Sequence, residues 1–519
     1  MSITQHRSGL LVAASILSLG FASTAHASES ADNANETSIG VDLDISNDVA
    51  GLDLSTVDTV ATFFALHSNN PETHPEFVVD ENTIVPRSDL SPNTLPPSGI
   101  LDPVNITGVG QMVTNNDTNR PGASLGTCTG TLINPRTVIF AAHCVNTRPA
   151  SAYGAASGGT PISFGFQANN LPGLRRWLGF DGAPAPFQTD TDLAIYNVEN
   201  VWYDPRSLVG GFLQADYAIA TLDTPAFDIP TWAMLFTPLD GQEHVTVTGY
   251  GSIGNGENGY FAFGGWRRRV AENYVSFLGS LQQRNLALFG PGSMSSQLPQ
   301  NLYMSAFNSP RGFDPATRSY DFGLFGENDT LLPREGITGS GDSGGPLILD
   351  QKYDIPLILG VLSGGSRFFA NQPFGAYGTH SFYQPLHAFW DQIVANNPYV
   401  YATNKEGDGE WTDGAHWVQE MDPSYQIVVD GKLVNGLPST PGEGISGEGA
   451  TFGDICFLGD CIDFTDPKAS TVDGPAYFVE GGPGSTGFVP NNVTANPAAR
   501  AITTSRCRPA EPPRCGAPT

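Results

Sequence analysis

The stretch GSGDSGGP, residues 339–346, runs directly into the apolar, strand-like residues 347–349. A serine hydroxyl attacks a carbonyl only when a base takes its proton, and the resulting oxyanion needs N–H donors that already point at it. A glycine-rich turn can aim its backbone N–H groups inward, because glycine tolerates conformations that other residues avoid. A Gly/Ser-rich stretch alone is usually a linker, but a strand that follows at once argues against one. The stretch therefore predicts Ser343 as a nucleophile, with the N–H groups of Gly341 and Ser343 as oxyanion donors.

A second stretch, LINPRTVIFAAHC at residues 132–144, places His143 after a strand-like run and two alanines. An isolated histidine is more often structural than catalytic. Of the nine histidines, His143 alone combines small neighbours, an upstream strand and an adjacent cysteine. These features predict His143 as the base that deprotonates Ser343.

Together the two stretches resemble the histidine and serine motifs of the chymotrypsin (S1) peptidase family. His143 precedes Ser343 as in that family, and the spacing of Cys128 and Cys144 matches the family's disulfide around its histidine loop. The resemblance covers residues 101–398. It implies an all-β fold of two packed six-stranded β-barrels with a C-terminal helix, and a triad in which an aspartate orients the histidine.

Two aspartates compete for the third place in this triad. The family pattern is Asp, apolar, Ala, apolar, followed by a Leu and then a Pro. Asp216 satisfies all of it, with Leu222 and Pro225 in the later positions. Asp192 heads a similar strand and lies nearer to the family's usual distance from His143, but an insertion before Asp216 explains that difference. We therefore expect Asp216 in the triad and Asp192 on the surface.

The resemblance also implies a substrate pocket. It places Ile337, six residues before the nucleophile, at the pocket floor with Thr338 beside it. Ser363 and Gly365 fall on the strand along which the substrate backbone pairs. An aspartate at the floor would suit Arg or Lys side chains, whereas isoleucine predicts an apolar or small one. No Ile-Val-Gly-Gly start marks an activation cleavage site.

Composition narrows the class of protein further. The chain carries 24 basic and 52 acidic residues, a formal net charge of -28. This acidity argues against nucleic acid as a partner, because each phosphate contact needs Lys or Arg. The 60 Gly and 40 Pro residues indicate many turns and few long helices, which favours an all-β fold.

The six cysteines occur as three close pairs, and local pairing is the simplest arrangement in an exported chain. The pairs are Cys128 with Cys144, Cys456 with Cys461, and Cys507 with Cys515. A structural zinc site is not expected, because no pair has a second Cys or His pair at the required spacing. We expect no metal and no cofactor.

The chain divides into four predicted regions. Residues 1–27 read as an export signal with a cleavage site near Ala27, and a membrane anchor is the alternative. Residues 28–100 are an acidic leader or pro-segment, which makes a zymogen the expectation. Residues 101–398 form the peptidase domain, with its closing helix at residues 382–395. Residues 399–519 form a Gly-rich, small β-rich extension. The mature protein is expected to be secreted, with no stable membrane anchor.

The extension carries the motif GDGEWTDGAHW at residues 407–417, which faintly resembles the start of bacterial autotransporter passenger repeats. One interpretation is a small β-rich extension packed on the peptidase. The other is a surface-binding module that uses Trp411 and Trp417.

The expected function is that of a secreted serine endopeptidase, which hydrolyses protein or peptide substrates through an acyl-enzyme. An inactive homologue that binds partners is one alternative, and the intact triad argues against it. An esterase is the other. The chain order in an α/β-hydrolase would be Ser, Asp, His, whereas Ser343 comes last here.

Overall fold

The computed structural model describes a large, mostly β part of the chain, and the described residues all belong to the second of two compact units, Met1–Thr37 and Ser38–Thr519. They are residues 42–44, 85–86, 105–182, 185–208, 213–262, 266–284, 299–314, 317–321, 323, 325, 331–368, 372–446, 449–457 and 460–463. The predicted export signal, most of the leader, and the last cysteine pair lie outside them. Within these ranges, no helix has the length and apolar character needed to cross a membrane.

The first half of residues 101–398 forms a closed barrel in the order β3-β4-β5-β8-β7-β6. Its strands are β3 (Ile106–Asn115), β4 (Leu125–Asn134), β5 (Thr137–Phe140), β6 (Ile162–Gln167), β7 (Ile195–Tyr203) and β8 (Ala218–Leu222). Apolar side chains fill its interior, among them Leu132, Phe140 and Phe164. Short helices lie between the strands: η3 (Ala142–Cys144), η4 (Ala150–Ala152), α2 (Leu171–Trp177) and η5 (Pro205–Leu208).

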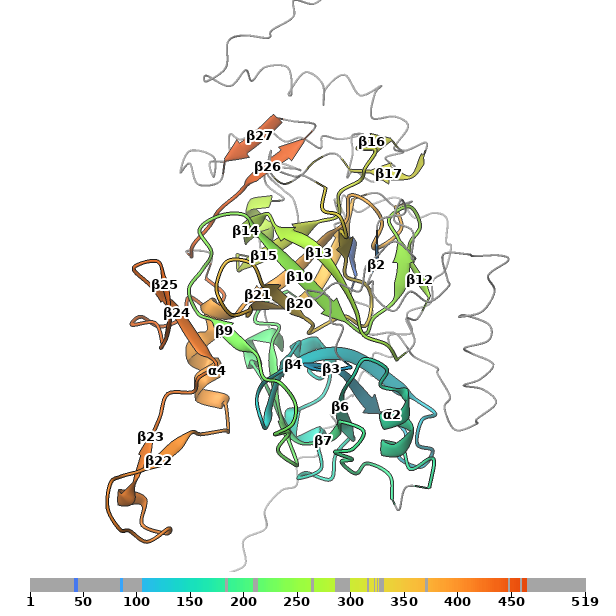
Figure 1. The fold of residues 1–519 in the computed structure, drawn as a ribbon. Helices are drawn as coiled ribbons and strands as arrows, with labels where there is room; N and C mark the ends of the chain where they lie inside the picture. The colour runs from blue at the N-terminus through green and yellow to red at the C-terminus, as the bar shows by residue number, and fades with distance from the viewer. Residues whose placement is uncertain are drawn as a thin grey trace, which may run out of the picture. The chain divides into compact units, whose positions relative to one another are not determined.

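The second half forms a larger sheet, drawn above the barrel in Figure 1, with the order β13-β10-β19-β20-β21-β15-β14. These strands are β10 (Glu243–Gly249), β13 (Arg269–Val275), β14 (Phe277–Ser280), β15 (Asn301–Ala306), β19 (Pro346–Leu349), β20 (Leu357–Arg367) and β21 (His380–Pro385). The pairing of the described strands is open at both ends. The mostly β fold with one six-stranded barrel is therefore confirmed, and the expected second barrel is not shown.

Several short strands attach to this framework. Two come from residues 28–100, the predicted leader: β1 (Asp42–Asp44) pairs with β20, and β2 (Val85–Pro86) pairs with β18 (Gly336–Ile337). β9 (Ala233–Leu235) runs parallel to the start of β20. Two further pairs are β11 (Ile253–Asn255) with β12 (Gly259–Ala262), and β16 (Phe313–Asp314) with β17 (Ser319–Tyr320).

The closing helix begins later than the sequence predicts. Residues up to Pro385 belong to β21, and only then follow η8 (Leu386–Phe389) and α4 (Trp390–Asn396). Phe382 pairs with Met304 of β15 on one side and with Gly364 of β20 on the other, so it is a strand residue inside the sheet. A short apolar run does not distinguish a buried strand from a helix, which explains the wrong start.

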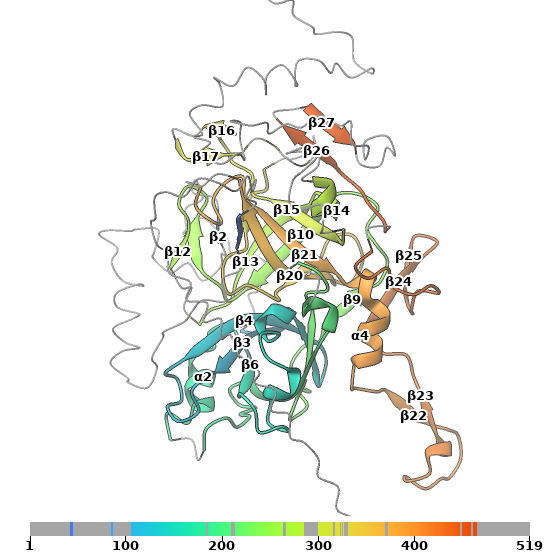
Figure 2. The same cartoon turned by 180° about the vertical axis from the view of Figure 1, so that it is seen from behind.

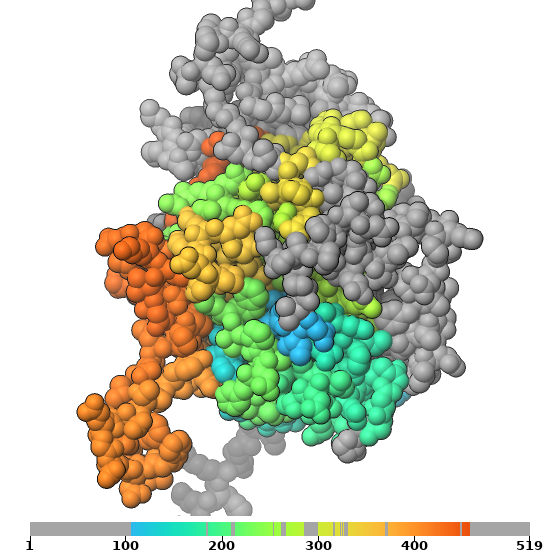
Figure 3. Space-filling model, in the orientation of Figure 1, coloured from blue at the N-terminus to red at the C-terminus, as the bar shows by residue number. Residues whose placement is uncertain are grey.

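The described part of the extension is β-rich. Its strands are β22 (Ala402–Asn404), β23 (Trp417–Gln419), β24 (Tyr425–Val429), β25 (Lys432–Asn435), β26 (Asp454–Phe457) and β27 (Asp460–Asp463), with η9 (Gly414–His416) before β23. β24 continues the large sheet by pairing with β9, and both views place it beside α4 (Figure 2). The segment with β22 and β23 stands away from the sheet (Figure 3), and Trp411 there is 80% exposed.

Candidate active site

The pairing of β5 with β8 brings His143 and Asp216 together. Phe140, the last residue of β5, lies opposite Ala218, the first residue of β8. The residues that follow β5 therefore lie beside the residues that precede β8. His143 sits in η3, and its neighbour Cys144 forms the predicted disulfide with Cys128 of β4. The side chains meet in a nearly closed space, since His143 is 7% exposed and Asp216 is 1% exposed.

Asp216 contacts His143 at two points. The backbone N–H of His143 donates to Oδ1 of Asp216 at 2.7 Å, and Nδ1 lies 2.7 Å from Oδ2. A carboxylate facing Nδ1 accepts a hydrogen bond from its N–H, so the proton stays on Nδ1 and Nε2 is left as the basic nitrogen. Ser363 also donates its hydroxyl to Oδ2 of Asp216. The rival Asp192 is exposed in the turn before β7.

The turn with Ser343 lies between β18 and β19 and rests on the barrel. The N–H of Thr129 donates to the carbonyl of Ser343 at 2.8 Å, and the hydroxyl of Thr129 donates to the carbonyl of Gly341 at 3.1 Å. Gly344 has a φ of 82°, and a Cβ there would lie 2.3 Å from Thr129 O and 2.7 Å from Ala141 N. Only glycine fits, and this close approach packs the serine turn against the loop that carries His143.

Two N–H groups of this turn remain available. Among the hydrogen bonds of the described residues, none is donated by the backbone N–H of Gly341 or of Ser343. Gly341 has a φ of 93°, a conformation that residues with a Cβ rarely adopt. The geometry therefore leaves the two donors that an oxyanion would need.

The carboxylate of Asp342, next to the serine, is anchored from inside the protein. Its Oδ1 accepts from Gly251 N at 2.7 Å and its Oδ2 from Gly339 N at 2.8 Å. The buried guanidinium of Arg269 supplies positive charge nearby. Burial lowers the pKa of Arg269 to about 10, and the charge of Asp342 opposes that shift, so Arg269 stays protonated at neutral pH. The folded chain itself thus supplies the partners that hold the serine turn.

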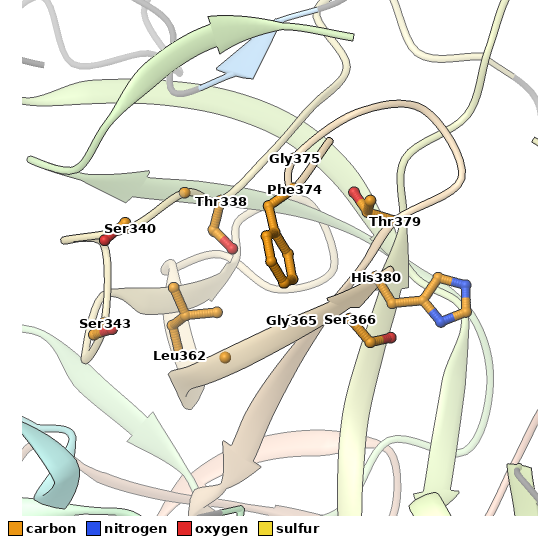
Figure 4. A pocket seen from close by; sticks show the side chains of 12 residues that line it. Thr338, Ser340, Ser343, Leu362, Gly365, Ser366, Phe374, Gly375, Thr379 and His380 are labelled. Carbon is orange, nitrogen blue, oxygen red and sulfur yellow. The ribbon is translucent and has the colours of Figure 1, made fainter. Parts of the chain in front are cut away.

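A narrow pocket of about 20 Å³ opens beside Ser343. Figure 4 shows the ring of Phe374 projecting into it, with Thr338 and Leu362 on the side of Ser343 and Thr379 on the other side. His380 lies on the side away from Ser343; burial, with the nearby charge of Arg284, lowers its pKa well below the usual value, so it is neutral.

The predicted substrate-binding residues occupy different places. Thr338 and Gly365 line the pocket, and Thr338 contacts the hydroxyl of Ser381 at 2.6 Å. Ser363 turns its hydroxyl to Asp216 instead. Ile337 is 2% exposed, belongs to the apolar core of the large sheet and is not among the residues that line this pocket.

One cluster has metal-ligating atom types. Cys128, His143 and Cys144 place such atoms within 4.8 Å of one another. Both cysteines form the disulfide with each other, so neither can serve as a thiolate ligand. Cys456 is also disulfide-bonded, and it lies opposite Cys461 in the β26–β27 register.

No protein-family model matches the chain, and no curated protein matches it either.

Sequence reasoning missed the residues that support this site. Thr129 holds the serine turn, Arg269 faces Asp342, and Gln384 donates to Ser363 at 3.2 Å. None belongs to a local motif. The one usable signal is the run of three arginines at residues 267–269, which leads into a strand-like stretch.

Proposed function

We propose that this protein is a serine endopeptidase that cuts protein or peptide substrates through an acyl-enzyme. The observation that carries the proposal is the double contact between His143 and buried Asp216, beside a turn that presents Ser343 with two unused N–H donors. This combination supplies a base, its orienter and charge stabilisation in one place.

The residues act in sequence. His143 takes the proton of Ser343 through Nε2 as Oγ attacks the peptide carbonyl. The N–H groups of Gly341 and Ser343 stabilise the oxyanion, and Asp216 stabilises the imidazolium. His143 then returns the proton to the leaving amine. Water, deprotonated by the same imidazole, hydrolyses the acyl-enzyme.

We extend the proposal to specificity. A pocket of about 20 Å³ with Phe374 inside it suits a small, uncharged side chain on the acyl side of the cut bond. A peptide library would test this, and rapid cleavage confined to Arg and Lys sites would contradict it.

We also propose that the protein is exported as a latent precursor and that the large sheet closes as a second barrel. Export rests on the sequence of residues 1–27. Latency is supported by β1, which runs antiparallel to β20 with Asp44 opposite Gly365, a residue of the pocket wall. β1 thus occupies the edge of β20 from Gly365 to Arg367, next to the residues with which a substrate backbone would pair. N-terminal sequencing tests this: the active form should begin after Asp44, and an active form retaining it contradicts latency.

Replacement of Ser343 by alanine tests the activity itself. Casein digestion should fall by about a million-fold, the scale set by loss of a triad serine. Ser446→Ala is a matched control, because the exposed hydroxyl of Ser446 donates to the backbone carbonyl of Glu443. Digestion by Ser343→Ala at the wild-type rate contradicts the proposal. Hydrolysis of small esters without casein digestion would indicate an esterase.

A further inference from the structure

Asp216 has a second side-chain partner whose orientation matters. The hydroxyl of Ser363 donates to Oδ2 of Asp216, the same oxygen that faces Nδ1 of His143. Ser363 is fully buried in β20. A hydroxyl has one proton and two lone pairs, so its other neighbours decide where the proton points.

Gln384 of β21 supplies the donor that fixes this direction. Its Nε2 donates to the carbonyl of Leu213 at 2.9 Å and to Oγ of Ser363 at 3.2 Å. A carbonyl oxygen only accepts, so the atom facing Leu213 is the amide nitrogen. Both amide hydrogens of Gln384 are thereby used, and one goes to Ser363. The proton of Ser363 is left for Asp216.

Gln300, directly before β15, extends the network. Its Nε2 donates to Oε1 of Gln384, and its Oε1 accepts from the N–H of Ala215 at 2.6 Å. A backbone N–H only donates, so this end of the network is fixed as well. Ala215 directly precedes Asp216 and has a φ of 48°, in the left-handed region that a residue with a Cβ rarely adopts. Gln300 thus holds a strained backbone position.

These contacts close into a ring that returns to its starting residue through one peptide bond. Its members are all buried: Asp216, Ser363, Gln384, Gln300 and Ala215. The direction of every hydrogen bond in the ring follows from two backbone groups, the carbonyl of Leu213 and the N–H of Ala215. A fully satisfied buried network of this kind has one favourable arrangement.

We propose that Gln384 and Gln300 are positioning residues that set the carboxylate of Asp216 against His143. Gln384 keeps the hydroxyl of Ser363 on the carboxylate, and Gln300 keeps the backbone before Asp216 in place. The kinetic consequence rests on the proposed peptidase function, whereas the geometric one does not.

The variant Gln384→Met preserves the length of the side chain and removes both of its donors. It should lower kcat by about 10- to 100-fold, since small displacements of catalytic groups have effects of that order. KM should not change, because Gln384 contacts no substrate. Gln426→Met is the matched control: Gln426 is a buried amide of β24 that donates to Pro423 O at 2.9 Å. Its kcat should be that of the wild type.

A double variant separates positioning from general structural damage. Since Gln384 acts through Ser363, Gln384→Met should add little further loss in a Ser363→Ala background. An equal loss with and without Ser363→Ala overturns the proposal. So does a raised KM with an unchanged kcat.

The proton between His143 Nδ1 and Asp216 gives a readout that needs no substrate. Its downfield ¹H resonance should shift or broaden in Gln384→Met and remain in place in Gln426→Met. An unchanged resonance in Gln384→Met overturns the proposal. If the wild type digests no protein and Ser343 takes up no acylating label, the peptidase function fails, and the resonance still decides the role of Gln384.

Discussion

The loop with His143 is closed by a covalent bond, whereas the turn with Ser343 is held by noncovalent contacts alone. The Cys128–Cys144 disulfide and a closed barrel surround the histidine. The serine turn belongs to a sheet whose described strands do not close, and Asp342 anchors it through two N–H donors and the nearby Arg269. The two side chains of the proposed triad are therefore held in place by different kinds of interaction. The histidine loop should survive conditions that dislodge the serine turn.

The largest effect is expected when the anchor of the serine turn is removed. Asp342→Asn leaves the cation of Arg269 buried without its opposing charge, and the new NH₂ group faces an N–H donor. The free energy of unfolding should fall by about 3–5 kcal/mol, the usual result of breaking a buried charge pair. Proteolytic rate per folded molecule should fall at least 100-fold, because the oxyanion donors flank Asp342.

Asp350→Asn is the control for that comparison. Asp350 directly follows β19, and its carboxylate forms hydrogen bonds with His244 and Thr246. Its side chain is less buried than that of Asp342. Urea unfolding and casein digestion should show it close to the wild type. If both variants lose activity equally, the special role of Asp342 is contradicted.

A smaller loss of stability is expected when the disulfide of the histidine loop is removed. Removing the bridge with Cys128→Ala and Cys144→Ala should lower the free energy of unfolding by about 3 kcal/mol, the loop-entropy value for a loop of this size. Activity at low temperature should persist, because Asp216 still holds His143 at both points. Thermal unfolding and digestion rates check this. Full loss of activity in a folded variant would mean that the disulfide, rather than Asp216, places the histidine.

The smallest effect is on the pH dependence of the unfolding free energy. It comes from a histidine in the half of the chain that forms the large sheet. His387 lies in η8 with its Nδ1 3.3 Å from the hydroxyl of Tyr303, and burial lowers its pKa to about 4. The unfolded chain therefore binds a proton more readily than the folded one between about pH 6.5 and pH 4, and stability falls as pH falls through that window. At pH 5 the loss from His387 is about 2 kcal/mol.

The variant His387→Gln removes this titration. The drop in unfolding free energy from pH 7 to pH 5 should be about 2 kcal/mol smaller than in the wild type. Equal drops in the wild type and His387→Gln would contradict the assignment.

The sequence predicts those residues of the candidate site that lie in local motifs. The stretches around His143 and Ser343 are local, and the choice of Asp216 over Asp192 rested on a strand pattern that burial now distinguishes, since Asp192 is exposed. The ring through Gln300 and Gln384 could not be anticipated. Its members lie far apart in the chain, and nothing in an isolated glutamine indicates that three strands will bring it to a carboxylate.

The same limit applies to the pocket and the closing helix. Distance along the chain from Ser343 predicts Ile337 at the pocket floor, but its side chain lies in the apolar core of the large sheet. Phe382 was assigned to the helix because buried strands and helices share short apolar runs. In both cases the position of the residue depends on contacts between segments far apart in the chain, which local patterns do not reveal.

The proposed nucleophile can be identified by treating the intact protein with a fluorophosphonate and mapping the modified residue by mass spectrometry. The label should be found on Ser343, and it should be lost in His143→Ala, because that serine reacts only when the imidazole takes its proton. Ser446→Ala should label like the wild type. A label on another residue, or equal labelling of Ser343 in the absence of His143, would contradict the central claim.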